Sequence, residues 1–224
     1  MTVVYLWRIH KRSLIFALMH MALDRFSLAR ISGMSFYKSI GTGTGERFTP
    51  SDADVTLWGL IAHTDSIETL DASFLVKRWR KIAIAEERIV MEAMSSHGEW
   101  AGRNPFPIAA RTSSDERVVA ITRARIKWNM NRLFWRSVPP VTRSLHSQPG
   151  LIRAIGIGEA PIGLQGTLSV WKDSASLRAF AYQGEEHARV IQATKEHNWY
   201  SEELFARFAV VEIRGSIGGV NTAE

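Results

Sequence analysis

Apolar and polar residues alternate along this chain in an order of strands and helices that occurs twice. Apolar positions two residues apart indicate strands, and positions three or four apart indicate helices. In the first part of the sequence they predict strands at 3–9, 34–40, 55–62 and near 88–94, with helices near 13–26 and 65–82. In the second part they predict strands at 117–125, 151–157, 164–171 and 204–213, with helices near 128–137, 173–182 and 185–196. Both parts therefore have the order βαββαβ.

The two parts also align with each other in sequence. The aligned pairs are Val3–Arg8 with Val118–Arg123, Phe36–Gly43 with Leu151–Gly158, and Leu60–Ser66 with Leu168–Ser174. The first two pairs lie 115 positions apart and the third 108, because the first part has seven extra residues after its glycines. At the second spacing His187 takes the place of Trp79.

A repeated βαββαβ order predicts the fold class. Such a unit is ferredoxin-like, with both helices on one face of an antiparallel sheet. The other face of each sheet is uncovered, and two copies can bury these faces against each other. We therefore expect an α+β fold of tandem ferredoxin-like units packed as an α+β barrel within one chain. The units are residues 1–100 and 117–214, with a proline-containing linker at 101–116 and a tail at 215–224.

Composition narrows the chemistry that such a fold can carry. The absence of Cys excludes disulfides, thiolate metal sites and a Cys nucleophile. The apolar stretch Leu14–Leu23 is about half of the ~20 residues that span a bilayer and lacks a cleavage site, so a cytoplasmic protein is expected. The net charge of +6 is scattered and interleaved with acids, so we expect no nucleic-acid partner. The aromatic surface of the eight Trp, taken together, is compatible with a large apolar ligand.

Glycines at the end of the second predicted strand form the most prominent local motif. The run from Gly41 to Glu46 has the spacing GxGxG, which is neither the dinucleotide fingerprint nor a phosphate loop. Glycines at a strand end indicate a bulge or a close backbone approach, and here they also precede the insertion, so this loop could shape a pocket mouth. The residues that we expect around a pocket are Gly41, Gly43, Gly45, Glu46, Glu159 and Trp171.

One histidine has a sequence environment that differs from the rest. Val190, Ile191 and Thr194 follow His187 at helical spacing, which places His187 on an apolar helix face. A histidine in that position is either a hydrogen-bonded core residue or a single axial haem ligand. The seven histidines show no metal-binding spacing such as HxH or HExxH. The residues alone leave both alternatives open and indicate no catalytic acid–base pair or nucleophile.

Several ordered motifs resemble the spheroidene monooxygenase family. The run Phe36–Pro50 (FYKSIGTGTGERFTP) is similar to the FxKxxGxGxGExFTP signature of that family. The resemblance continues through Trp100–Phe106, Ile155–Pro161, His187–Ile191 and Trp199–Phe208. It covers about residues 3 to 214, which is nearly the whole chain.

The resemblance implies a specific activity. Members are oxygenases that use O₂ and electrons from a ferredoxin-type donor to oxidise an acyclic, spheroidene-like carotenoid at C-2 to a 2-keto product. It also implies a b-type haem with His187 as the axial ligand, and Lys38, Arg153 and Arg189 as partners of the haem propionates. An apolar carotenoid substrate predicts contact with the surface of the inner or photosynthetic membrane. Two alternatives remain, namely a haem- or lipid-binding protein without turnover and a different haem enzyme on the same scaffold.

Overall fold

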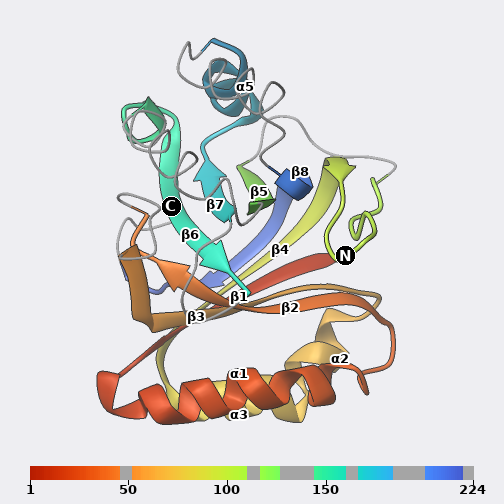
Figure 1. The fold of residues 1–224 in the computed structure, drawn as a ribbon, viewed down its shortest axis with the longest axis vertical. Helices are drawn as coiled ribbons and strands as arrows, with labels where there is room; N and C mark the ends of the chain where they lie inside the picture. The colour runs from red at the N-terminus through yellow and green to blue at the C-terminus, as the bar shows by residue number, and fades with distance from the viewer. Residues whose placement is uncertain (46–51, 110–116, 127–143, 160–165, 184–199, 219–224) are drawn as a thin grey trace.

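Eight antiparallel strands form the framework of the computed structural model, which describes residues 1–45, 52–109, 117–126, 144–159, 166–183 and 200–218 (Figure 1). The strands are β1 (Thr2–Ile9), β2 (Met34–Gly43), β3 (Ala53–Thr64), β4 (Ala83–Gly98), β5 (Val118–Ile126), β6 (Leu151–Gly158), β7 (Gly166–Trp171) and β8 (Tyr200–Gly215). The helices are the short 3-10 helix η1 (Lys11–Ser13), α1 (Leu14–Leu28), α2 (Ile67–Asp71), α3 (Phe74–Ile82) and α5 (Ser174–Gln183).

The sheet closes on itself. Its strand order is β1-β3-β2-β6-β7-β5-β8-β4, and β4 pairs with β1 to complete the ring. The first half therefore reads β4-β1-β3-β2 and the second half β8-β5-β7-β6, which is the same order. These observations confirm an α+β protein with an antiparallel sheet. The helices expected near 128–137 and 185–196 lie outside the described residues, so the complete tandem unit stays a prediction.

The two halves meet along two seams of unequal length. At one seam β4 and β8 are paired over eleven residue positions, from Glu87 with Gly215 to Gly98 with Leu204. At the other seam β2 and β6 are paired at three positions among the described residues, Gly41 with Gly158, Thr42 with Ile157 and Gly43 with Gly156. The glycines of the two aligned motifs thus lie directly against each other across the second seam.

The inside of the barrel is a packed apolar core. Alternate residues of the strands point inward, as the two-residue period of a strand requires, and include Leu6, Ile61, Ile121 and Leu168. Phe106, which belongs to the expected linker, and Ile217, which belongs to the expected tail, are also buried in this core. The expected linker and the expected tail therefore each contribute a side chain to the packed core.

Two details differ from the sequence prediction. The single helix expected at 65–82 is two helices, because Ser66 and Ser73 each cap a new helix with a hydroxyl that accepts a backbone N–H three residues on. The alignment of the third strands was wrong by one residue. Tyr5 pairs with Leu60 and its equivalent Ala120 pairs with Ser169, so Leu60 corresponds to Ser169 and not to Leu168. A shift of one residue exchanges the two faces of a strand.

The helices of the first half cover the outer face of their sheet. Figure 1 shows α1 and α3 side by side beneath β1, β2 and β3, with α5 at the opposite end of the molecule beside β7. None of the described helices is both long and apolar enough to cross a bilayer.

Candidate functional site

The outer faces of the two half-sheets carry side chains of very different size. We call the outward-pointing residues of β1, β3 and β4 under α1 and α3 the first outer face, and those of β5 to β8 the second outer face. The members of the first are Val3, Tyr5, Trp7, Ile9, Trp58, Leu60, Ala62 and Val90. The second includes Val118, Ala120, Thr122, Ala124, Leu151, Ala154, Gly156, Thr167, Ser169, Trp171, Phe205, Arg207 and Ala209. The contrast between them locates a candidate site.

Aromatic rings fill the first outer face. The Trp7 and Trp79 rings are stacked with centroids 5.1 Å apart, and the Tyr5 ring also stacks on Trp7 at 5.4 Å. Their polar atoms are also bonded, since Trp79 Nε1 donates to buried Asp24 at 2.9 Å and Trp7 Nε1 donates to Glu86 at 2.8 Å. Stacked, hydrogen-bonded rings of this kind leave no room for a ligand between α3 and the sheet.

Small side chains stand at the equivalent places of the second outer face. In the strand register Tyr5 and Trp7 correspond to Ala120 and Thr122. Ile9 aligns with Ala124 at the same spacing of 115 in the sequence. Similarly, Trp58 and Leu60 correspond to Thr167 and Ser169. Among the described residues, the rings of the first face are therefore absent from these strand positions, and Ala120 and Ala154 are buried in a cluster with Leu145 and Leu177. A sheet surface made of Ala, Ser, Thr and Gly lets a flat group or another segment approach the backbone closely.

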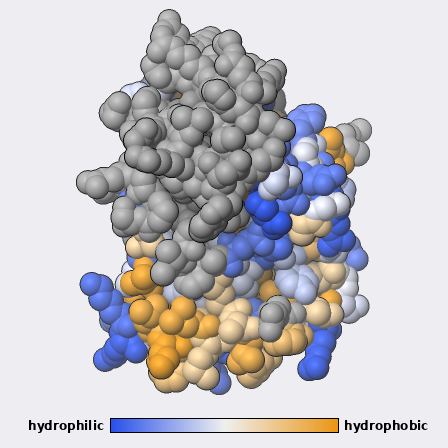
Figure 2. Space-filling view, viewed as in Figure 1, coloured by the Kyte–Doolittle hydropathy of each residue, from blue (hydrophilic) through white to orange (hydrophobic). Residues whose placement is uncertain are grey.

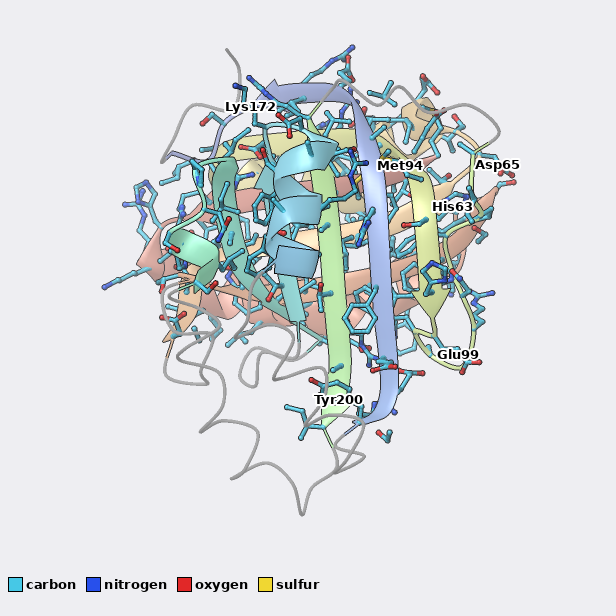
Figure 3. All side chains as sticks on the ribbon, turned by 90° about the horizontal axis from the view of Figure 1, so that it is seen from above. His63, Asp65, Met94, Glu99, Lys172 and Tyr200 are labelled. Atoms are coloured by element: carbon cyan, nitrogen blue, oxygen red, sulfur yellow. The ribbon has the colours of Figure 1, made fainter. Side chains whose placement is uncertain are left out.

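The edges of the second outer face are aromatic and cationic. At one side Trp171 stacks on Phe180 of α5 at 5.4 Å, and its Nε1 donates to Ser169 Oγ at 2.9 Å. At the other side Arg207 of β8 is half-buried and pairs across the ladder with Ala120. Figure 3 looks onto this side of the molecule, with α5 over the sheet and the strands β5 and β8 beside it. Tyr200, labelled there, marks the start of β8.

Several of the predicted site residues fall outside the described part of the chain. His187, Arg189 and Glu46 are in this group, and their predicted roles stay predictions. Trp171 is described and lies on the second outer face, where it is fully buried. Of the predicted pocket residues with known positions, it is the one whose side chain belongs to the second outer face.

Lys38 and Arg153 point into the barrel instead of toward the second outer face. Lys38 pairs with Ile61, a core residue, and its Nζ donates to Glu159 Oε2 at 2.7 Å. The Arg153 guanidinium makes two hydrogen bonds to the fully buried carboxylate of Glu87, one of them 3.0 Å long. Lys38 and Arg153 thus each have a protein carboxylate as their partner, and their predicted role toward haem stays untested.

Glu159 is the centre of an ionic cluster at one end of the barrel. Its Oε1 accepts from Arg123 at 2.8 Å and from Trp100 Nε1 at 2.9 Å, while Oε2 accepts from Lys38. Arg123 is buried inside the barrel, lies over the Trp100 ring at 5.3 Å and also bonds Glu202. A small recess is bordered by Trp100, Arg123 and Glu159 of this cluster together with Ile40, Ile157 and Gly158. The cluster connects both halves of the sheet.

Burial and ion pairing act in opposite directions on Glu159. Burial alone raises the pKa of its carboxyl, but the hydrogen bond and charge of Lys38, the Trp100 N–H and the charge of Arg123 outweigh it, so the pKa is lowered. The pKa of Glu202 is also lowered, because the backbone N–H of Gly102 and the Arg123 guanidinium overcome the effect of burial. Both carboxyls are therefore ionised near neutral pH and cannot serve as proton donors there.

The predicted glycines serve the backbone. Gly41 and Gly43 form the short seam with β6, and the register of β2 against β3 shifts between Gly41 and Thr42, which marks a bulge. Gly45 has φ +79°, and a Cβ there would lie 2.1 Å from the carbonyl oxygen of Ala154. These contacts agree with the expected close backbone approach. Whether the glycines also border a pocket stays a prediction.

Sequence reasoning missed Arg123 and the small-residue surface. The signal for the surface was present in the aligned repeat, where Tyr5 and Trp7 stand opposite Ala120 and Thr122. The sequence marks Arg123 only as the end of the aligned segment Val118–Arg123, and its burial depends on partners that are 36 and 79 residues away. Among the described residues, no three His, Cys, Asp or Glu side chains come together as a metal-binding group.

Comparison with known proteins places the chain among named enzymes. No family model matches it. It is 38% identical over 210 residues to a spheroidene monooxygenase of Rhodobacter capsulatus, covering 91% of this chain and 87% of that protein. It is 34% identical over 191 residues to a spheroidene monooxygenase of Rubrivivax gelatinosus, covering 82% of this chain and 71% of that protein. A crystal structure of aldoxime dehydratase has the same fold, with a TM-score of 0.56 at 10% identity over 93% of this chain and 80% of the other.

Proposed function

The chain belongs to the spheroidene monooxygenase family, a family of oxygenases, and from that premise we propose that it oxidises an acyclic, spheroidene-like carotenoid at C-2 to a 2-keto product. Each hydroxylation puts one oxygen atom of O₂ into a C–H bond and reduces the other to water, so a reductant is required. We propose a ferredoxin-type electron donor. Two hydroxylations of the same carbon followed by loss of water give the ketone.

A cofactor has to supply the O₂ chemistry, since side chains alone do not activate O₂ against an unactivated C–H bond. We propose a b-type haem held at the second outer face, with His187 as its axial ligand. The observation that carries this proposal is the replacement of Tyr5 and Trp7 by Ala120 and Thr122 at equivalent strand positions. A flat macrocycle fits a sheet face on which the described strand positions carry small side chains in place of these rings.

The residues at the edges of this surface have matching chemistry. Trp171 and Phe180 form an apolar aromatic wall. Arg207 lies on the same face as Ala120, its neighbour across the ladder. Thr122 and Phe205, neighbours across the ladder, are exposed and would form the edge at which an apolar chain enters. We also propose, from the sequence, that Arg189 pairs with a haem propionate.

The two halves would then have different tasks. We infer that residues 1–100 and 117–214 are tandem copies joined by 101–116, with 215–224 as a tail, in line with their common strand order. The first copy stabilises the fold through its aromatic layer, and the second holds the cofactor. We also propose that the protein is cytoplasmic and reaches its apolar substrate at the surface of the inner or photosynthetic membrane.

The experiment adds back the bulk that the second face lacks. Ala120→Tyr and Thr122→Trp install the residues of the first half at the equivalent places. We expect haem-reconstituted wild-type protein to show a Soret band. Its intensity should be at least about tenfold lower in Ala120→Tyr and Thr122→Trp, because the new side chain excludes the macrocycle, and in His187→Ala, because the axial ligand is removed. Thr122→Ser is the matched control and keeps the band. Far-UV circular dichroism checks that each variant is folded.

Turnover is tested separately from haem binding. Wild-type protein incubated with spheroidene, reduced ferredoxin and O₂ should yield the 2-keto carotenoid, detected by mass spectrometry. A carrier without turnover would return the carotenoid unoxidised. A Soret band of full intensity in Ala120→Tyr would instead show that the cofactor does not lie on this face.

A further inference from the structure

The outward side of α1 is apolar where a surface helix is normally polar. Ile15 is 64% exposed, Phe16 and Met19 are each 53% exposed, and Leu18 and Leu23 are more than 40% exposed. We call these five residues the α1 apolar face. At 100° per residue they lie within one side of the helix, and the residues between them on that side include no charge among the described side chains.

The inward side of the same helix is already used. Ala17 and Leu28 pack in the core of the first outer face, and Asp24 accepts hydrogen bonds from Trp79 and from Ser39 Oγ at 3.0 Å. The helix is therefore apolar on both sides but covered on only one of them. Helices that are apolar all round are normally buried on all sides, which indicates that the α1 apolar face has a binding partner.

The exposed apolar surface continues onto the neighbouring helix. Phe74 at the start of α3 is 70% exposed, and α1 and α3 pack side by side. Figure 2 shows hydrophobic residues gathered over this end of the molecule, where Figure 1 places α1 and α3. Exposed apolar side chains are thus present on both of these neighbouring helices.

Positive charges surround this patch. Lys11 and Arg12 precede α1, Arg30 follows it, and Lys77 and Lys81 lie on the exposed side of α3. Among the described side chains of residues 11–30 and 74–82 no acid is exposed, because Asp24 is 1% exposed. An apolar face bordered by lysine and arginine is the arrangement of helices that lie in the interface of an anionic membrane.

We propose that the α1 apolar face, with Phe74, docks onto the surface of an anionic lipid bilayer. A second copy of this chain fits less well. Pairing two such faces brings Lys11 and Arg12 against the same residues or against Arg30 of the other copy, so positive charge meets positive charge in either orientation. Anionic headgroups complement the whole border. The choice of a bilayer also rests on the proposed function, because an acyclic carotenoid is dissolved in lipid.

The first experiment needs neither haem nor carotenoid. The protein is floated with vesicles of phosphatidylcholine, with and without phosphatidylglycerol, at low and high salt. We expect binding to the anionic vesicles that weakens as salt screens the basic border. Phe16→Gln with Met19→Gln should lower vesicle binding about tenfold or more, since both side chains lose their transfer into the interface. Ile108→Gln, at an apolar residue that is 61% exposed elsewhere, is the matched control and should bind like wild type.

Three results would overturn the proposal. Wild-type protein could fail to float with anionic vesicles at low salt, or the double variant could float as well as wild type. Sedimentation velocity could also show a dimer that the double variant dissociates, with no vesicle binding, which would assign the face to a second copy.

A turnover assay separates this proposal from the proposed function. If the proposal holds, the double variant oxidises detergent-solubilised spheroidene at the wild-type rate but oxidises spheroidene in vesicles at least about tenfold more slowly. Absence of turnover in wild-type protein under both conditions would refute the proposed function, while the flotation result still decides the membrane contact.

Discussion

Replacing Glu159 by Gln removes the central charge of the cluster and leaves its shape nearly unchanged. The substitution takes a carboxylate partner from Arg123, which is 2% exposed, and from Lys38, whose side chain is 23% exposed. Breaking a fully buried ion pair costs about 3–5 kcal/mol. Here the Glu159 side chain is 28% exposed and Arg123 keeps Glu202, so water and the remaining pair recover part of that cost. We therefore expect a loss of about 2 kcal/mol in the free energy of unfolding.

The measurement is urea denaturation at pH 7, with Glu203→Gln as the control because Glu203 is an exposed acid on the same strand as Glu202. The control should change the free energy of unfolding by no more than about 0.5 kcal/mol. A loss of 2 kcal/mol corresponds to a Tm lower by about 4–8 °C for a chain of this size. Equal midpoints for the two variants would refute the reasoning, since the cluster would then contribute nothing beyond a surface charge.

The same substitution has a signature in pH. The folded-state pKa of Glu159 lies below its ordinary value of 4.5, so the unfolded chain binds the proton more readily. The stabilisation is therefore complete above about 4.5 and is lost as the pH falls through the folded-state pKa. We expect the difference in stability between wild type and Glu159→Gln to shrink in this acidic window. A difference that stays constant down to low pH would show that the charge of Glu159 is not its cause.

Two further predictions concern a glycine and a histidine. Gly45→Ala should cost about 3 kcal/mol or more, because its φ of +79° disfavours a side chain and the new Cβ meets the Ala154 carbonyl at 2.1 Å. Gly102→Ala, at φ +75° with open space, should cost only about 1 kcal/mol in the same urea assay, and equal costs would contradict the role of the contact. Burial, with the nearby charge of Arg78, lowers the pKa of His20 from 6.5 to about 4, so its contribution is complete above 6.5 and lost as the pH falls toward 4. His20→Gln should flatten stability against pH in that window, and parallel curves would exclude His20 as the cause.

Periodicity predicted most of the fold because it reports which residues face a core. The strands at β1, β2, β5 and β6 and the helix α1 lie within a few residues of their predicted positions. The break between α2 and α3 was missed, since it depends on the Ser73 hydroxyl as a cap and not on the apolar pattern. The size of the insertion was also missed by one residue, because sequence similarity between Leu60 and Leu168 outweighed the pairing that only the ladder shows.

The candidate site was harder to predict than the fold. Glu159 was identified from its place after a glycine motif, but its partners come from two other strands, β2 and β5, and from the loop that follows β4. Such contacts depend on strand register and on barrel closure, which join residues far apart in the sequence. The small residues of the second outer face were visible in the alignment. The structure was needed to show that Tyr5, the equivalent of Ala120, belongs to an aromatic stack with Trp7.

The unequal seams give the closed sheet a preferred place to open. Among the described residues β2 is paired with β6 at three positions, whereas β4 is paired with β8 at eleven, so fewer backbone hydrogen bonds hold the short seam. Local opening begins where the fewest bonds hold an element. Backbone amides of Thr42 and Ile157 should therefore exchange with deuterium earlier than those of Met91 and Val210. The two halves would then separate at the β2–β6 seam while the β4–β8 seam stays paired and holds them together.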